Sequence, residues 1–191
     1  MQHEIWLVRH GETEWSATRR HTSHTDVPLT ESGRAAASRL APALAQHVFA
    51  LVLTSPLTRA RDTAVLAGFP DAIVDDDLHE WDYGDLEGLT TDQICTRGGP
   101  FAEWSIFDGP APGGETIEQV AARTARVLAR ADAADGDVLC FGHGHALRVL
   151  TTMALGLAPA AGAHFALDPA TVNVVGWERS TRALRAWNVR A

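Results

Sequence analysis

Short apolar runs alternate with longer amphipathic stretches along most of the sequence. The runs have the length and the apolar continuity of strands that are buried on both faces of a sheet. The stretches between them carry an apolar residue every three or four positions, as helices packed against a sheet do. The predicted strands are 5–8, 50–53, 72–74, 137–141, 172–177 and 184–189, and the predicted helices are 30–46, 56–67, 116–133 and 145–155.

This alternation predicts an α/β fold. We expect a three-layer αβα sandwich whose central sheet is mostly parallel and carries helices on both faces. Ser55 and Pro56 are typical of an N-cap and a first-turn proline, and so predict the start of the second helix. The stretch 75–114 is irregular, with two short helices expected. A length of 191 residues, without repeats or linkers, predicts a single domain over 1–191.

Charged and polar residues follow the predicted strands at the points where they end. Arg9-His10 follow the first strand, and His143, between two glycines, follows the strand 137–141. Arg59 lies just beyond the second strand, and Glu80 comes after the third. Ligands of parallel α/β sheets bind beyond the carboxyl ends of the strands. We therefore expect one edge of the sheet to gather two histidines, several arginines and a glutamate.

Arginine beside histidine favours one kind of chemistry at that edge. A divalent metal site needs neutral imidazole and carboxylate ligands, which neighbouring guanidinium groups oppose. A phosphate group, by contrast, is matched by the fork of a guanidinium. One of the two imidazoles can then act as a covalent nucleophile on phosphorus, and a nearby carboxylic acid can protonate the leaving oxygen.

Charge and composition exclude several classes of protein. The formal net charge of −8 argues against non-specific binding to nucleic acid or to anionic membranes. All sixteen basic residues are arginine, which excludes Schiff-base chemistry and a lysine-dependent phosphate loop. The start of the sequence has no basic n-region, and the two cysteines lie far apart. Reduced thiols in a cytoplasmic protein are therefore expected.

Other phosphatase chemistries fit the sequence poorly. Neither Cys95 nor Cys140 has an arginine six positions later, and the acidic run 75–77 lacks the rest of an aspartyl-phosphatase motif. His143-Gly144-His145 resembles a metal motif but has no further ligand set of suitable spacing. We expect His21 and His24 to be solvent-exposed. The arginines at 123 and 148 are expected to be solvated or ion-paired, and the aromatic residues 81, 83 and 104 to pack the irregular segment onto the core.

Five segments together resemble a known family. They are "LVRHGETEW" from Leu7, "SPLTRARDTA" from Ser55, "HEWDYGDLEG" from His79, "PGGET" from Pro112 and "FGHGHALRVL" from Phe141. In this order they are similar to the histidine phosphatase superfamily, the phosphoglycerate-mutase-like proteins. The resemblance runs from Ile5 to about Leu150.

The resemblance implies a role for each core residue. His10 is the histidine that becomes transiently phosphorylated, and Glu80 is the proton donor. Arg9, Arg59 and His143 complete the phosphate pocket. No metal and no organic cofactor is implied. Departures from the family pattern lie in the substrate-facing shell. Polar contacts to the substrate are expected there from Ser16, Thr22 and Ser23, and Gly144 is also expected to contact the substrate.

The compact segment 80–115 and the lack of lysine resemble the phosphatase branch, including sedoheptulose-bisphosphatase-type and broad acid phosphatase members. The expected function is metal-independent hydrolysis of a small phosphorylated metabolite, a sugar phosphate or small phospho-acid, through phosphohistidine on His10, with inorganic phosphate as product. The alternatives are a phosphoglycerate mutase and a non-catalytic phosphate-binding module. No nucleic-acid or membrane partner is expected, and the oligomeric state, a homodimer included, is left open.

Overall fold

The computed structural model of the chain describes residues 2–190 and places six strands of this part in one sheet. The order across the sheet is β3-β2-β4-β1-β5-β6. The first four strands in that order run parallel to one another, whereas β5 and β6 are antiparallel to their neighbours. The fold class predicted from the sequence is confirmed, as a mixed sheet. The strands are β1 (Ile5–Arg9), β2 (Leu51–Thr54), β3 (Ile73–Val74), β4 (Val138–Gly142), β5 (Thr171–Glu178) and β6 (Thr181–Arg190).

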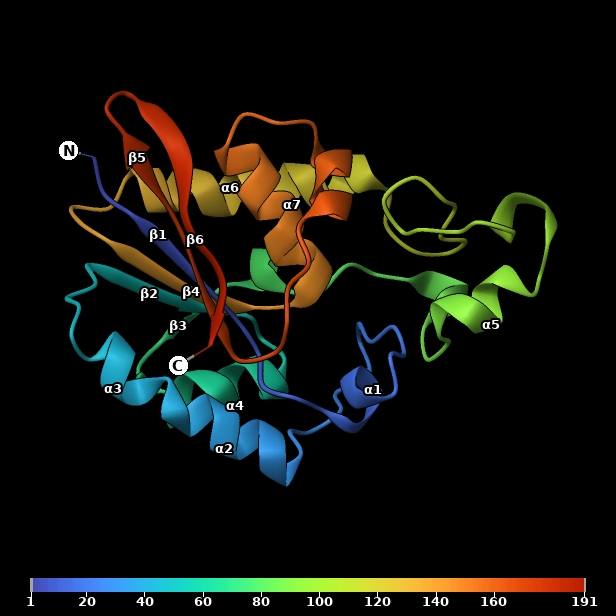
Figure 1. Ribbon diagram of the computed structural model, residues 1–191, viewed down its shortest axis with the longest axis horizontal. Coiled ribbons are helices and arrows are strands. Elements are labelled where there is room, and N and C mark those ends of the chain that lie inside the picture. The colour runs from blue at the N-terminus through green and yellow to red at the C-terminus, as the bar shows by residue number, and fades with distance from the viewer. Residues whose placement is uncertain (1, 191) are drawn as a thin grey trace.

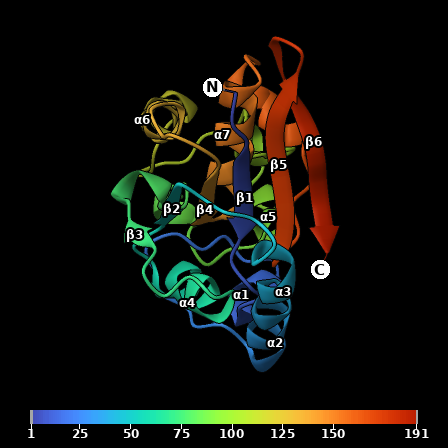
Figure 2. The same cartoon turned by 90° about the vertical axis from the view of Figure 1, so that its left-hand side faces the viewer.

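Helices cover both faces of the sheet (Figure 1). One face carries α2 (Glu31–Arg39), α3 (Ala41–Leu44) and α4 (Thr58–Leu66), and the other carries α6 (Ile117–Asp132) and α7 (Gly144–Ala154), as the turned view also shows (Figure 2). The short helices α1 (Glu14–Ala17) and α5 (Thr91–Cys95) lie beyond the carboxyl ends of the parallel strands. Short 3₁₀ helices occur at Asp76–Leu78, Gly84–Leu86, Gly99–Phe101 and Pro159–His164.

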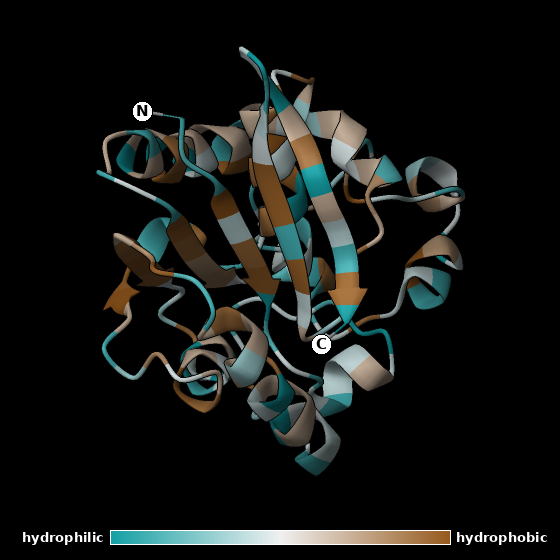
Figure 3. Cartoon of the chain, turned by 60° about the vertical axis from the view of Figure 1, so that its left-hand side comes forward, coloured by the Kyte–Doolittle hydropathy of each residue, from teal (hydrophilic) through white to brown (hydrophobic). Residues whose placement is uncertain are grey.

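Strand alternation sends side chains into two separate cores. Leu7 of β1 and Cys140 of β4 pack against α6 and α7, whereas their neighbours Val8 and Phe141 pack against α2, α3 and α4. This is the period of two that a strand imposes on its side chains. Both faces of the central strands are consequently apolar, while β6 at the edge carries more polar residues (Figure 3).

The register of the parallel strands aligns the residues that the sequence singled out. Arg9 is paired with Gly142, and the His10 amide donates to the Gly142 carbonyl at 2.9 Å. On the other side of β4, the Ser55 amide donates to the Phe141 carbonyl at 2.9 Å. The strand ends of β1, β4 and β2 therefore lie side by side, as the sequence predicts.

Two predicted helices differ from the observed ones. The helix expected over 30–46 is interrupted after Arg39 and resumes as α3, which has Pro42 in its first turn. Proline has no amide proton, and its ring displaces the carbonyl four residues earlier, so the hydrogen-bond ladder breaks there. The helix expected from 56 begins at Thr58, with Leu57 as an extended N-cap and without a side-chain cap. The prediction that Ser55 caps this helix was wrong.

Arg123 is ion-paired, which is one of the two states expected for it, with Nε 2.9 Å from Glu115 Oε1. It is buried on α6, with 3% of its surface exposed, and is therefore not solvated. The aromatic residues of the irregular segment pack as predicted. Trp81, Tyr83 and Trp104 are buried in a third apolar cluster beyond the sheet. Within residues 2–190, no helix has both the length and the apolar character needed to span a bilayer.

Candidate active site

A cavity of about 340 Å³ opens beyond the carboxyl ends of β1 and β4. Of the residues predicted from the sequence, it is lined by Arg9, His10, Ser16, Thr22, Glu80 and Gly144. The other lining residues are Arg19, Arg20, His21, Tyr83, His145, Arg148, Leu167, Asp168 and Pro169. A volume of this size suits a whole small metabolite.

His10 is fixed by a hydrogen bond within its own turn. Nδ1 lies 2.7 Å from the Gly11 carbonyl oxygen, which can only accept, so Nδ1 carries the proton and donates. In the neutral ring, Nε2 is then left with its lone pair. His10 is 5% exposed and lies at the cavity wall. The turn thus presents an imidazole nitrogen in the state that a nucleophile requires.

The surroundings keep His10 neutral. Burial is the largest influence that lowers the pKa of His10 well below its ordinary value, and the charges of Arg59 and Arg9 lower it further. The hydrogen bond to Gly11 acts in the opposite direction. Desolvation and neighbouring cations both disfavour a charged imidazole. At neutral pH the ring is therefore unprotonated at Nε2.

His143 faces His10 and is oriented by Ser55. The two imidazole rings lie with their centroids 5.1 Å apart. Nε2 of His143 is 2.7 Å from Ser55 Oγ, which also accepts a hydrogen bond from the Leu57 amide at 3.3 Å. The Ser55 proton is thus free to be donated to Nε2, and this places the proton of neutral His143 on Nδ1. Burial lowers the pKa of His143 well below its ordinary value, ahead of the charge of Arg59.

Arg9 is the last residue of β1 and lines the cavity, whereas Arg59 lies in the first turn of α4, which follows β2. Arg9 donates from Nη1 to the Leu167 carbonyl. Arg59 is fully buried and donates to the carbonyls of Thr22, Ser23 and Thr25, and so holds the loop that follows α1. In each arginine Nε is buried and has no hydrogen-bond partner among residues 2–190.

Glu80 is anchored at the amino end of α7. Its Oε1 accepts from the amides of Trp81 at 2.8 Å and Ala146 at 2.9 Å, and its Oε2 accepts from the His145 amide at 3.1 Å. Glu80 is 5% exposed and lines the cavity together with His10. These bonds fix the carboxyl group in one orientation at the wall of the cavity that His10 also lines.

Three buried nitrogens of the site share one property. Arg9 Nε, Arg59 Nε and His143 Nδ1 have no hydrogen-bond partner within residues 2–190. Buried donors are normally satisfied, because leaving one unpaired costs about 1–3 kcal/mol. Three unsatisfied donors around a neutral histidine are arranged to bind an anion with several acceptor oxygens. Across the same residues, no group of three or more histidine, cysteine or acidic side chains is placed to hold a metal ion.

The predicted substrate-facing residues have different positions. Ser16, Thr22 and Gly144 line the cavity. Ser16 is engaged with the turn at Thr13, and the Thr22 hydroxyl donates to the Arg20 carbonyl. Ser23 is buried and is not among the lining residues, and its hydroxyl lies 3.5 Å from the Glu80 carbonyl oxygen. The Ser23 hydroxyl therefore faces the backbone of the Glu80 segment.

Sequence reasoning missed several residues of the cavity. His24 is exposed as predicted, but His21 is half-buried and lines the cavity, so its predicted exposure was wrong. Burial lowers the pKa of His21 to about 4. Arg148 and His145 also line the cavity, and their spacing of three on one helix was the available signal. Ser55 was assigned a capping role because Ser-Pro is the usual start of a helix.

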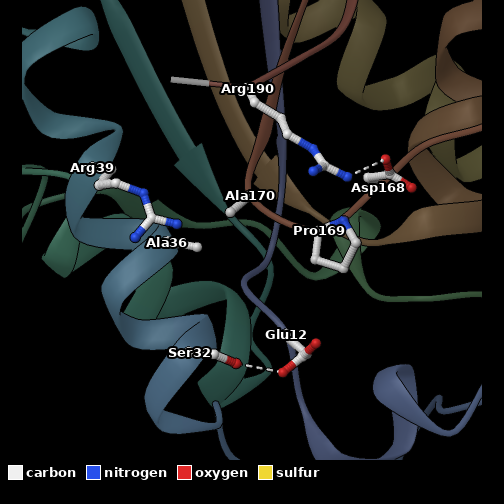
Figure 4. A pocket seen from close by; sticks show the side chains of 8 residues that line it. All are labelled: Glu12, Ser32, Ala36, Arg39, Asp168, Pro169, Ala170 and Arg190. Atoms are coloured by element: carbon white, nitrogen blue, oxygen red, sulfur yellow. Dashed lines mark hydrogen bonds and ion pairs between the residues drawn. The ribbon is translucent and has the colours of Figure 1, made fainter.

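A second cavity of about 330 Å³ adjoins the first through Asp168 and Pro169 (Figure 4). Three of its charged residues have partners: Arg190 pairs with Asp168 at 3.1 Å, and Glu12 accepts a hydrogen bond from the Ser32 hydroxyl. Arg39 lies on its wall and forms no ion pair within the described part of the chain. His10 and Glu80 do not line this cavity, so we place the chemistry in the first one.

Comparison with known proteins gives the family. Residues 5–190 match the model of the histidine phosphatase superfamily (branch 1). The chain belongs to this superfamily. It is 39% identical over 186 residues to an acid phosphatase of Mycobacterium tuberculosis, with 95% of this chain and 90% of the relative covered. It is also similar to sedoheptulose 1,7-bisphosphatase of Saccharomyces cerevisiae, with 35% identity over 181 residues that cover 79% and 67% of the two chains.

Solved structures agree with this assignment. A structure of a Mycobacterium tuberculosis open reading frame has a TM-score of 0.94 and 36% identity, and covers 100% of this chain and 99% of its own. The expected superfamily and its phosphatase class are thereby confirmed. In this histidine phosphatase, Arg9 is the last residue of β1, and His10 and His143 directly follow β1 and β4.

Proposed function

We propose that this histidine phosphatase hydrolyses monoesters of small phosphorylated metabolites, sugar phosphates or small phospho-acids, through a phosphohistidine on His10. The observation that carries the proposal is the set of buried donors that have no partner within residues 2–190, Arg9 Nε, Arg59 Nε and His143 Nδ1, beside the neutral His10 ring. A phosphoryl group placed there satisfies these donors with its oxygens. Donors that are in position before the reaction stabilise the charge of the transition state without reorganisation.

In the first step, the lone pair of His10 Nε2 attacks phosphorus. The ester P–O bond breaks as the P–N bond forms, and the proton of the Glu80 carboxyl group goes to the leaving oxygen. The alcohol departs and leaves a phosphohistidine. The guanidinium groups of Arg9 and Arg59 balance the negative charge on the non-bridging oxygens.

In the second step, a water molecule attacks the phosphorus. The Glu80 carboxylate takes a proton from this water, the P–N bond breaks, and Nε2 of His10 recovers its lone pair. Inorganic phosphate is released, and Glu80 is again protonated for the next cycle. The same carboxyl group thus serves as acid and then as base, a role that needs the fixed position which its three amide donors provide.

The test is phosphate release from a panel of sugar phosphates, bisphosphates, phosphoserine, phosphoglycerates and p-nitrophenyl phosphate in the presence of EDTA. We expect EDTA-resistant release, and a loss of about four orders of magnitude or more in kcat for His10→Ala, because the nucleophile is removed. Circular dichroism of the variant checks that the fold is retained. Turnover that survives in His10→Ala would remove the proposal.

Two other results would replace it. Transfer of label between 2- and 3-phosphoglycerate without net release of phosphate indicates a mutase. Binding of vanadate by a folded protein that hydrolyses no compound of the panel indicates a non-catalytic module.

A further inference from the structure

The catalytic cavity holds more positive charge than one reacting phosphate requires. Beyond Arg9 and His10, it is lined by Arg19 and Arg20, just after α1, and by Arg148 on α7. These three arginines come from two elements that are far apart in the sequence. The chain as a whole has a net charge of −8, so the cations are concentrated at this cavity against the overall charge.

The carboxylates of the cavity form no ion pair with these arginines within residues 2–190. Glu80 is held by three backbone amides, and Asp168 is paired with Arg190 and accepts from Asn188 Nδ2. Across residues 2–190, Arg19, Arg20 and Arg148 form no ion pair. Their charges are therefore available to a ligand.

Arg148 is held in place without being neutralised. Its Nε donates to the Gly162 carbonyl at 2.8 Å and its Nη2 donates to the Ala163 carbonyl at 3.0 Å. The guanidinium also stacks on the ring of Phe107, 4.5 Å from its centroid. Nη1 makes no hydrogen bond within residues 2–190. A cation fixed in this way loses little conformational freedom when an anion binds.

His145 supplies a neutral donor beside Arg148. Its Nδ1 lies 2.6 Å from the hydroxyl of Tyr83. Burial raises the pKa of Tyr83 well above its ordinary value, so the hydroxyl keeps its proton and donates it to Nδ1. Burial also lowers the pKa of His145 well below its ordinary value, so the ring is neutral and its single proton lies on Nε2. His145 and Arg148 are three residues apart and share a face of α7.

We propose that the outer part of this cavity is a second anion subsite, and that the preferred substrates carry a phosphate or carboxylate group on the leaving-group side in addition to the phosphate that is hydrolysed. The inference rests on the proposed function and narrows its substrate class. Arg148 and His145 contact the second anion, while Arg19 and Arg20 attract it from the mouth of the cavity. Local cations offset the repulsion that the net negative charge of the chain exerts on a multiply charged ligand.

The test uses pairs of substrates that differ in the second anionic group alone. Fructose 1,6-bisphosphate is compared with fructose 6-phosphate, and 3-phosphoglycerate with glycerol 3-phosphate, with p-nitrophenyl phosphate as a reference. We expect kcat/KM of the unmodified enzyme to be at least about tenfold higher for one or both of the doubly anionic members, and this preference to shrink as ionic strength rises. The two pairs distinguish a phosphate subsite from a carboxylate subsite.

Substitutions assign the preference to residues. Arg148→Gln is expected to lower the preference about tenfold, mainly through a higher KM for the doubly anionic substrate. Arg148 also ties down the turn Pro159–His164, so a double variant, Arg19→Gln with Arg20→Gln, tests exposed side chains whose loss leaves the fold unchanged. Arg39→Gln is the matched control, because it removes the same charge from the neighbouring cavity (Figure 4) and is expected to leave the preference unchanged.

Equal kcat/KM for both members of each pair would overturn the proposed subsite. The phosphatase function is tested separately, by the release of phosphate from p-nitrophenyl phosphate. An equal loss of preference in Arg39→Gln and in the Arg19/Arg20 variant would also overturn it, because the effect would then follow net charge alone. If no compound is hydrolysed, the proposed function fails, and the subsite is judged by calorimetry on His10→Ala. Binding of fructose 1,6-bisphosphate at least tenfold tighter than fructose 6-phosphate supports it, and equal affinity refutes it.

Discussion

Two arginine-rich regions of this molecule use the same side chain in opposite ways. On α6, Arg123, Arg126 and Arg130 are paired with the carboxylates of Glu115, Asp77 and Asp75. In the cavity beyond β1 and β4, Arg19, Arg20 and Arg148 form no ion pair with a carboxylate in the described part of the chain. Close to it, Arg9 and Arg59 each have a buried Nε without a hydrogen-bond partner in the same residues, although Arg59 Nη1 also lies 3.9 Å from Asp26 Oδ1. The paired arginines hold the protein together, whereas the unpaired ones are those that we propose to bind an anion from solution.

The α6 cluster fixes the segment that carries Glu80. Arg123 donates to the carbonyls of Asp77 and His79, and Glu115 accepts from the Asp82 amide. The backbone is thus held on both sides of Glu80. Burial would raise the pKa of Glu115, but its contact with His79 at 3.7 Å and its hydrogen bonds with Arg123 prevail and lower the pKa to about 2. The carboxylate therefore stays charged over the whole physiological range and keeps its partner.

The largest effect is expected from removing Arg123, which belongs to the ion-paired region. Arg123→Met leaves Glu115 half-buried without its main partner, and we expect the free energy of unfolding to fall by about 3 kcal/mol. Urea denaturation measures it. The variant should also lose activity, because the segment around Glu80 loses its anchor, and Arg123→Lys should recover part of both. A stability change below about 1 kcal/mol would show that the pair contributes no more than a surface pair.

Ser55→Ala tests the other region, in which donors around His10 have no partner in the described residues. Without the serine proton, His143 Nε2 loses the donor that keeps its own proton on Nδ1. We expect kcat/KM to fall about ten- to a hundredfold, as for a misplaced catalytic group. Vanadate affinity should fall by a similar factor, because the N–H group at Nδ1 of His143 would donate to vanadate as it does to the substrate phosphate.

Nitrogen NMR of His143 distinguishes a positioning role from a structural one. The unmodified protein should show the Nδ1–H form, and Ser55→Ala should show a mixture of the two neutral forms. An unchanged spectrum in a less active variant would assign the loss to packing instead.

Arg130→Gln is expected to have the smallest effect. Arg130 is partly exposed, and its ion pairs with Asp75 and Asp77 are weakened by solvent, so we expect a stability loss of at most about 1 kcal/mol. Phosphatase activity should stay within twofold, since Arg123 alone anchors the carbonyls next to Glu80. Thermal unfolding and initial rates on p-nitrophenyl phosphate measure the two quantities. A tenfold loss of activity would show that Arg130, like Arg123, helps to position Glu80.

Local patterns in the sequence were sufficient for much of this fold. The strands around Leu7 and Cys140 were predictable because buried parallel strands are continuous apolar runs, and the turns after them carry glycine. The sequence also placed His10 and His143 at strand ends, and the parallel register then brings their rings to 5.1 Å. The break at Pro42 was present in the sequence as a proline, but helical periodicity continues through it and conceals it.

Contacts between distant residues could not be predicted in this way. Ser55 and His143 are 88 positions apart, and Arg123 meets the Asp77 carbonyl across 46 positions. A serine before a proline has the same local pattern whether it caps a helix or orients a histidine, and an arginine on an amphipathic helix has the same spacing whether solvated or buried.

The sequence by itself determined the order of the strands and helices and the residue types at the strand ends, because both depend on neighbours within a few positions. Only the tertiary structure decided which donors remain without partners, since that depends on every group packed around them. It satisfied Arg123 with Glu115 and two carbonyls and left Arg148 Nη1 and His143 Nδ1 without a partner in the part of the chain it describes. The arginines of α6 therefore stabilise the fold. In that part of the chain, the donors around the cavity stay unpaired, and we propose that they bind an anion.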